Sequence, residues 1–169
     1  MRLSVETAFL EKLSDFGIKL GLDKTVHLLG RLGNPHRRYP SILIAGTNGK
    51  GSVAATLAAI LREGGFRTGL YTSPHLLDVR ERMAVDGAPV SREEFGEGIR
   101  RLRRIIEDLP YHLYPTYFEA LTVIAFAWFA DAGVDVTVAE VGMGGRFDAT
   151  NVLPSTIEVI TPISLDHTQ

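Results

Sequence analysis

Short apolar runs alternate with longer amphipathic or apolar stretches along this chain. Four runs have the length and composition of buried strands, at 41–45, 67–71, 134–140 and 157–161. Five stretches have the periodicity or length of helices, at 5–16, 23–32, 52–63, 91–108 and 116–131. This alternation predicts an α/β fold, a three-layer domain of the P-loop type built on a mainly parallel sheet.

Two local patterns add detail to this outline. Asp86-Gly87 separates the segments 79–85 and 88–90, which predicts a hairpin with a tight turn. Ser91 and Glu94 have the spacing of a capping box, so a helix should begin there.

Unusual loops follow all four predicted strands. They are polar or glycine-rich and span 46–52, 72–78, 142–151 and 162–169. Because the carboxyl ends of parallel strands meet at one edge of a sheet, ligands gather there. The sequence therefore predicts a ligand site at this edge.

The first of these loops has the composition of a phosphate-binding turn. It reads Gly46-Thr47-Asn48-Gly49-Lys50-Gly51-Ser52 between a strand and a helix. Glycines let backbone N–H groups approach phosphate oxygens, the helix N-terminus adds positive potential, and Lys50 can reach the terminal phosphates. The spacing departs from G-x-x-x-x-G-K-[ST], because Gly51 separates Lys50 from Ser52. The flanking strand and helix favour phosphate binding over a glycine-rich turn with a solvated lysine, and leave the nucleotide open.

Three further residues near this edge could hold a metal or move a proton. Glu140 ends an apolar strand, where a carboxylate commonly holds Mg²⁺ beside a nucleotide; the alternative is a carboxylate facing water. Ser73 could ligate Mg²⁺ or bind phosphate, or simply form a turn with Pro74. His75 is a candidate for proton transfer, although an isolated histidine is often structural.

The loop 142–151 carries a second cluster of candidates. Arg146 could clamp a carboxylate or phosphate with its fork of N–H groups, and Asp148 lies two residues further on. The alternative is an Arg146–Asp148 ion pair that only braces the loop. His167, after the fourth strand, could ligate a metal through a neutral ring nitrogen.

Composition narrows the class of protein. The chain has 169 residues, which suits one domain, and a net charge of −2, which argues against a general nucleic-acid or membrane surface. It has no cysteine and no apolar run of membrane-spanning length, so we expect a cytoplasmic protein. The loop character of 165–169 leads us to expect the N-terminal piece of a longer protein.

Five motifs together resemble a known enzyme family. They are GTNGKGS (46–52), YTSPHL (71–76), TYFEALT (116–122), EVGMGGRFDATN (140–151) and SLDHT (164–168). In this order they resemble the folylpolyglutamate synthase and dihydrofolate synthase group of the ATP-dependent Mur ligase superfamily. The first motif fits any Mur-type ligase, whereas SPHL together with GGRFDATN points to the folate branch.

The resemblance implies a role for each motif. The ATP phosphate loop would include Thr47, Asn48, Gly49 and Lys50, and the magnesium ligands would be Ser73, Glu140 and His167. The pterin or folate pocket would be lined by Ile18, Lys19, Leu20, Thr116, Tyr117, Phe118, Glu119, Arg146 and Asp148. Lys19 stands where members that use dihydropteroate often have an acid, which argues weakly against dihydrofolate synthase activity.

The resemblance also implies an activity. Residues 1–169 would be the N-terminal part of the central ATPase domain of a Mur ligase, without the C-terminal glutamate-binding domain, and inactive alone. The intact enzyme would use ATP and Mg²⁺ to join L-glutamate to a folate or to dihydropteroate through an acyl phosphate. Its partners would be these small molecules, and we expect a monomer. Two alternatives are another Mur-type amide ligase and a non-catalytic nucleotide-binding module.

Overall fold

A six-stranded sheet forms the middle of the molecule. The computed structural model describes residues 5–17 and 21–164, and its sheet has the strand order β4-β3-β2-β5-β1-β6. The strands are β1 (Ser41–Ala45), β2 (Thr68–Tyr71), β3 (Met83–Val85), β4 (Ala88–Pro89), β5 (Val136–Glu140) and β6 (Ile157–Ile160). The four predicted strands therefore exist, with ends that differ by at most two residues from the predicted ones.

Most of the sheet is parallel. β1 lies between β5 and β6, β2 pairs with the other side of β5, and all three of these pairings are parallel. The predicted hairpin forms β3 and β4, which continue the sheet in antiparallel fashion. Asp86 in its turn has a φ of 52° and Gly87 a φ of 82°, as a tight hairpin turn requires.

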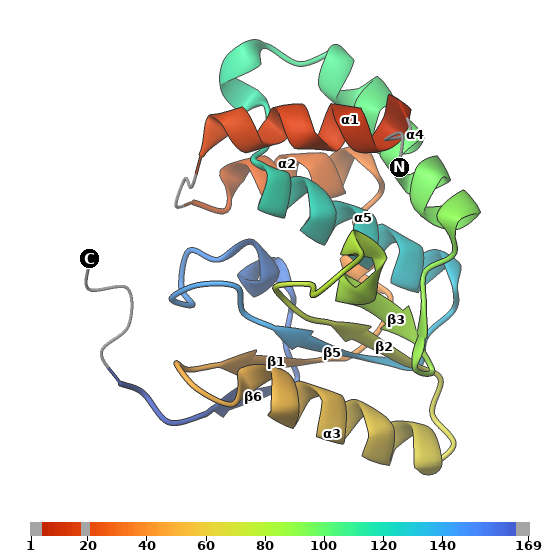
Figure 1. The fold of residues 1–169 in the computed structure, drawn as a ribbon, viewed down its shortest axis with the longest axis vertical. Helices are drawn as coiled ribbons and strands as arrows, with labels where there is room; N and C mark the ends of the chain where they lie inside the picture. The colour runs from red at the N-terminus through yellow and green to blue at the C-terminus, as the bar shows by residue number, and fades with distance from the viewer. Residues whose placement is uncertain (1–4, 18–20, 165–169) are drawn as a thin grey trace.

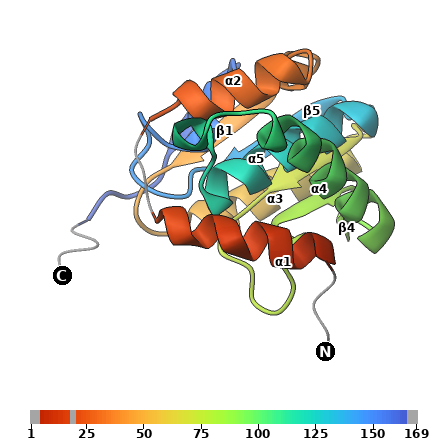
Figure 2. The same cartoon turned by 90° about the horizontal axis from the view of Figure 1, so that it is seen from above.

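Helices cover both faces of the sheet unequally (Figure 1). The helices are α1 (Val5–Lys12), α2 (Asp23–Arg31), α3 (Lys50–Glu63), α4 (Arg92–Glu107) and α5 (Tyr117–Asp131). α3 packs alone on one face, against β1, β2 and β5. On the other face α5 lies next to the sheet, and α1, α2 and α4 pack around it (Figure 2). The predicted three-layer α/β fold is confirmed.

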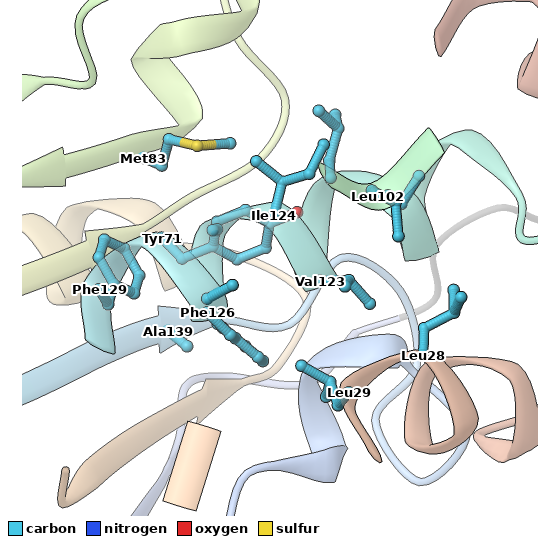
Figure 3. Close-up of a cluster of buried hydrophobic side chains, with 14 of the residues drawn as sticks. Leu28, Leu29, Tyr71, Met83, Leu102, Val123, Ile124, Phe126, Phe129 and Ala139 are labelled. Carbon is cyan, nitrogen blue, oxygen red and sulfur yellow. The ribbon is translucent and has the colours of Figure 1, made fainter. Parts of the chain in front are cut away.

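The main core lies around α5. This helix is apolar on every side, so it must be enclosed by other elements, and ten of its residues are buried. Figure 3 shows its side chains Val123, Ile124, Phe126 and Phe129 among residues from α2, α4 and three strands. A smaller cluster around Ile44 fills the space beneath α3. The larger core holds the strand ends and α5 in a fixed relation.

Two segments differ from the sequence prediction. The first helix ends at Lys12 and continues as a 3-10 turn, η1 (Leu13–Phe16). Residues 79–82, predicted as strand, form the 3-10 turn η3 (Val79–Arg82) instead. The cause of the second difference is local, because Asp78 and Glu81 form a capping box that starts this turn. Among the described residues no helix is long and apolar enough to cross a membrane.

Candidate active site

The loops after β1, β2, β5 and β6 come together, as the sequence predicted. Backbone N–H groups of Thr47 and Asn48 donate to the Pro162 carbonyl oxygen, at 3.1 and 3.4 Å. The Ser73 N–H donates to Glu140 Oε2 at 3.1 Å, which joins the loop after β2 to the end of β5. The carboxyl edge of the parallel strands is thus one connected surface.

The glycine-rich turn has the backbone geometry of a phosphate site. Gly46 has a φ of 131°, and a side chain there would meet the Thr161 carbonyl oxygen at 2.8 Å. Gly49 has a φ of 80° and is the N-cap of α3. Both positions therefore need glycine, the first also because of this close approach.

Donor groups are available where α3 begins. Within the described part of the chain, the N–H groups of Lys50, Gly51 and Ser52 have no acceptor, because intrahelical bonding starts at Val53. The Lys50 ammonium group donates to the Thr47 carbonyl oxygen at 3.2 Å, so it stays next to its own loop. Together with the helix N-terminus, these groups make a surface that favours a polyanion.

Glu140 lies directly beside this turn. The residue is 5% exposed, and its carboxylate accepts the Ser73 N–H and would be 3.4 Å from a Cβ atom placed on Gly51. Burial raises the pKa of Glu140, and the Ser73 hydrogen bond and the Lys50 charge partly oppose that rise. The predicted alternative, a carboxylate facing water, does not describe this buried group.

Of the other two predicted metal ligands, Ser73 is among the described residues and His167 is not. His167 lies outside the described residues, so its role as a ligand stays a prediction. In the described ranges, no three His, Cys, Asp or Glu side chains gather as a metal site. Ser73 and Glu140, which the sequence also predicts as ligands, are in contact.

A cavity of about 590 Å³ opens next to the glycine-rich turn at 46–52. Its lining includes Lys50, Ser73 and four of the predicted substrate residues, Thr116, Tyr117, Phe118 and Glu119. Asp148 lines it too, with Ser14, Gly17, Gly21, Pro74, Arg82, Gly142, Met143, Phe147 and Ala149. Ile18, Lys19 and Leu20 lie outside the described residues, between Gly17 and Gly21. One cavity thus connects the glycine-rich turn at 46–52 to residues that are predicted to line the folate pocket.

The start of α5 forms an aromatic wall of this cavity. Thr116 is the N-cap of α5 and Glu119 closes a capping box with it, since the Thr116 N–H donates to Glu119 Oε2 at 2.7 Å. The Phe118 ring fills the space beside Gly142, where an added Cβ would lie 3.0 Å or less from ring carbons. The cap fixes where Tyr117 and Phe118 begin, so the wall is preorganised.

Asp148 organises the glycine-rich loop from within. It accepts the Met143 N–H at 2.8 Å, the Thr150 N–H at 2.9 Å and the Thr150 hydroxyl at 2.6 Å. Arg146 is exposed, and no ion pair joins it to Asp148 in the described structure, so the bracing pair that the sequence left open is not formed. Asp148 lines the cavity, while Arg146 is not among the lining residues.

His75 is held by a residue that the sequence did not single out. Arg82 Nε donates to His75 Nδ1 at 2.9 Å, and Arg82 itself lines the cavity. Met143 and Phe147 also line it without having been predicted. The GMGGRFD segment drew attention to its charged and glycine residues, but no local signal marked Arg82. The predicted role of His75 in proton transfer stays a prediction.

Comparisons with known proteins point in one direction. No protein-family model matches the chain. It is 41% identical over 155 residues to the dihydrofolate synthase/folylpolyglutamate synthase of Bacillus subtilis, which covers 90% of this chain and 36% of that protein. It is 43% identical over 174 residues to the Mycobacterium tuberculosis enzyme of the same name, covering 98% and 36%. The chain therefore spans about a third of the length of these curated relatives.

Solved structures agree with the sequence comparison. Mycobacterium tuberculosis folylpolyglutamate synthase complexed with ADP superimposes with a TM-score of 0.87 and 46% identity, over 97% of this chain and 39% of that one. A bifunctional folylpolyglutamate synthase/dihydrofolate synthase with Mn, AMPPNP and L-glutamate bound gives a TM-score of 0.88 and 38% identity, over 98% and 40%. The resemblance to this group, inferred from the motifs, is thereby confirmed over nearly the whole chain.

Proposed function

We propose that this chain is the nucleotide-binding and folate-binding part of an ATP-dependent ligase that joins L-glutamate to a pterin-bearing carboxylic acid. The observation that carries the proposal is the cavity in which Lys50 and Ser73 share walls with Tyr117 and Phe118. An anion-binding turn beside an aromatic slot suits a reaction between a triphosphate and a flat heterocyclic acid. The relatives bound to ADP, or to AMPPNP and L-glutamate, support the same reaction class.

The residues at the turn also fit a magnesium ion. Mg²⁺ prefers carboxylate and hydroxyl oxygens together with phosphate oxygens. Glu140 presents a buried carboxylate against the start of α3, and it accepts the N–H of Ser73, a residue that carries a hydroxyl. We therefore assign Ser73 and Glu140 as ligands, with His167 as a third that lies outside the described residues. When bound, the ion would neutralise charge on the phosphates.

The chemistry is amide formation in two steps. A carboxylate oxygen of the pterin-bearing acid attacks the γ-phosphorus of ATP, and the bond from this phosphorus to the β,γ-bridging oxygen breaks. ADP departs, and the acid becomes an acyl phosphate. The amino nitrogen of L-glutamate then attacks the acyl carbon, loses a proton, and displaces inorganic phosphate. Lys50 and the N–H groups at the start of α3 hold the phosphates in line, and the aromatic wall holds the acid. Positioning and charge stabilisation thus supply most of the catalysis.

One assay on the full-length protein tests the proposal. ADP release is measured with ATP and L-glutamate in the presence of dihydropteroate or of tetrahydrofolate. We expect ADP release that requires both L-glutamate and at least one of the two acids. Lys50→Ala should lower kcat/KM by about 10³–10⁵-fold, as expected for a phosphate-clamping group, whereas Lys12→Ala on the exposed end of α1 should not.

The same assay separates the competing functions. ATP binding without any glutamate-dependent ADP release would favour a non-catalytic nucleotide-binding module. Release with an amino acid or peptide precursor but with neither pterin acid would favour another Mur-type ligase. The ratio of rates with the two acids identifies the acceptor, and a cytoplasmic, monomeric enzyme stays our expectation.

A further inference from the structure

The backbone of Arg82 is hydrogen-bonded to the residue that follows β2. It ends η3, and its carbonyl oxygen accepts the Thr72 N–H at 2.9 Å, which extends the antiparallel pairing of β2 with β3. The next pair in the ladder joins Met83 to Tyr71, a fully buried residue. The backbone of Arg82 is therefore set one residue away from Ser73, at the start of the loop that borders the cavity.

The Arg82 guanidinium is oriented by two side chains. Its Nε donates to His75 Nδ1 at 2.9 Å, and its Cζ lies 5.8 Å from the centre of the Tyr117 ring. A cation at this distance from a tyrosine face is attracted by the ring. These contacts involve Nε and Cζ of Arg82. The two terminal nitrogens, with their four N–H bonds, therefore stay available to another acceptor. Within the described residues, these terminal nitrogens have no acceptor and Arg82 has no ion-pair partner.

The acidic side chains that line the cavity make their hydrogen bonds away from Arg82. The described lining residues that carry positive charge are Lys50 and Arg82, and the acidic ones are Glu119 and Asp148. Glu119 accepts a backbone N–H in the cap of α5, and Asp148 accepts three bonds within its own loop. Lys50 sits at the phosphate turn. Arg82 is thus a half-buried cation at the cavity that has no ion-pair partner among the described residues.

We propose that Arg82 binds a carboxylate of the pterin-bearing acid and guides that end of the molecule toward Lys50. This inference rests on the proposed function. The fork of terminal N–H groups matches a carboxylate in bidentate geometry, which an ammonium group does not. Tyr117 supports both partners, because its ring lies in the aromatic wall and under the guanidinium.

His75 follows from this arrangement as a positioning residue. The Nε of arginine always carries a proton, so His75 Nδ1 must accept, and a neutral ring then bears its proton on Nε2. This contact occupies Nδ1, and the predicted role of His75 in proton transfer stays a prediction. His75 acts through Arg82, because its Nδ1 accepts the Nε–H of Arg82 and so orients the guanidinium.

Equilibrium binding to the full-length protein tests the assignment directly. The probes are dihydropteroate and its carboxamide, in which an amide replaces the carboxylate. The wild-type protein should bind the acid about 10–100-fold more tightly than the carboxamide, the range for hydrogen bonds to a charged group. Arg82→Gln should bind both with equal, weaker affinity. Arg82→Lys should recover only part of the preference, since it keeps the charge but loses the fork.

Matched measurements separate substrate binding from a general defect. Arg104→Gln, an exposed arginine on α4, should leave the preference for the acid unchanged. In Arg82→Gln the affinity for ATP should stay within about twofold of the wild type, as should the KM for L-glutamate. A preference for the acid that survives in Arg82→Gln would overturn the proposal. So would a rise in the KM for L-glutamate alone, because that result assigns Arg82 to the incoming amino acid.

A second pair of variants tests the support from His75. His75→Gln keeps an acceptor that can reach Arg82 Nε, and His75→Leu removes it. We expect the glutamine variant to retain most of the preference for the acid and the leucine variant to lose it. Equal losses in both variants would refute the positioning role. Binding is measured without turnover, so an inactive full-length protein that still prefers the acid would reject the proposed ligase reaction while supporting Arg82.

Discussion

Glu140 occupies the point where the end of β5, the loop after β2 and the start of α3 meet. It accepts the Ser73 N–H and lies against Gly51, so its carboxylate faces the loop after β2 and the start of α3. Its pKa is raised by burial, which means that a nearby positive charge is needed to keep it ionised at low cost. A divalent cation at the proposed metal site would supply such a charge.

Replacement of this carboxylate should therefore change the metal dependence of the full-length enzyme. Glu140→Gln preserves shape and the bond from Ser73 but removes the negative charge. We expect the concentration of Mg²⁺ needed for half-maximal ADP release to rise at least about tenfold, as for loss of a metal ligand or its support. Glu158→Gln, on the edge strand β6, serves as the control. An unchanged magnesium titration would remove Glu140 from the metal site.

His36 gives the fold a pH dependence of its own. It is buried in η2 (Pro35–Arg37), its Nδ1 has no partner among the described residues, and burial together with the Arg37 charge lowers its pKa to about 4. The unfolded chain takes up this proton near pH 6.5, the folded chain only near pH 4. Between these values the free energy of unfolding should fall with falling pH, by up to about 1.4 kcal/mol per unit.

The variant His36→Leu isolates this contribution. Carboxylates titrate in both proteins, so the difference between them reports the histidine alone. Denaturant unfolding at pH 7, 6 and 5 should show a smaller loss of stability in the variant than in the wild type. Parallel curves for the two proteins would mean that His36 is as accessible to protons in the folded chain as in the unfolded one.

At the scale of elements, the caps of α4 and α5 illustrate how far local sequence can predict. Ser91 and Glu94 form the predicted capping box of α4, and Thr116 and Glu119 form an equivalent one on α5. The second has the same T-x-x-E spacing, but its residues were interpreted through the family resemblance as pocket lining. In the structure the cap of α5 lines the cavity, while its role in binding a pterin or folate stays a prediction.

This difference predicts different outcomes for equivalent substitutions. Ser91→Ala and Thr116→Ala each remove the side-chain oxygen that accepts an N–H in the first turn. Each should lower the free energy of unfolding by about 1 kcal/mol. Only Thr116→Ala should also reduce the rise in Tm on adding dihydropteroate, because it loosens the aromatic wall. Equal ligand-induced shifts in both variants would show that the cap of α5 plays no part in binding.

Strands, helices and the ligand-binding edge could be predicted because their signals are local or follow from sheet topology. The turn η3 was misassigned as strand because the Asp78–Glu81 cap overrides the propensity of its residues. Arg82, Met143 and Phe147 were missed for a different reason. They reach the cavity through contacts between segments far apart in sequence, and no short pattern encodes such contacts.

At the scale of the whole molecule, stability rests mainly on one side of the sheet. The cluster around α5 includes Phe126 and Phe129, both fully buried, while the cluster beneath α3 is much smaller. The helix that carries the aromatic wall, α5, therefore lies in the larger of the two core clusters.

Two phenylalanines allow this distribution to be measured. Phe126→Ala should cost about 3–5 kcal/mol of unfolding free energy, the range for truncating a buried aromatic ring. Phe66→Ala removes the same atoms from a ring that is 52% exposed, and should cost less than about 1 kcal/mol. The comparison uses denaturant unfolding under identical conditions. Similar losses for both would contradict a core centred on α5.

The close approach of Gly46 to Thr161 links the edge of the sheet to the glycine-rich turn at 46–52. Thr161 directly follows β6, the outermost parallel strand, whose Ile157 and Ile160 side chains are exposed. A Cβ atom on Gly46 would clash with Thr161, so a shift of β6 should also move the turn that contains Gly46. A substitution that displaces β6 should therefore also displace the turn that we propose binds ATP.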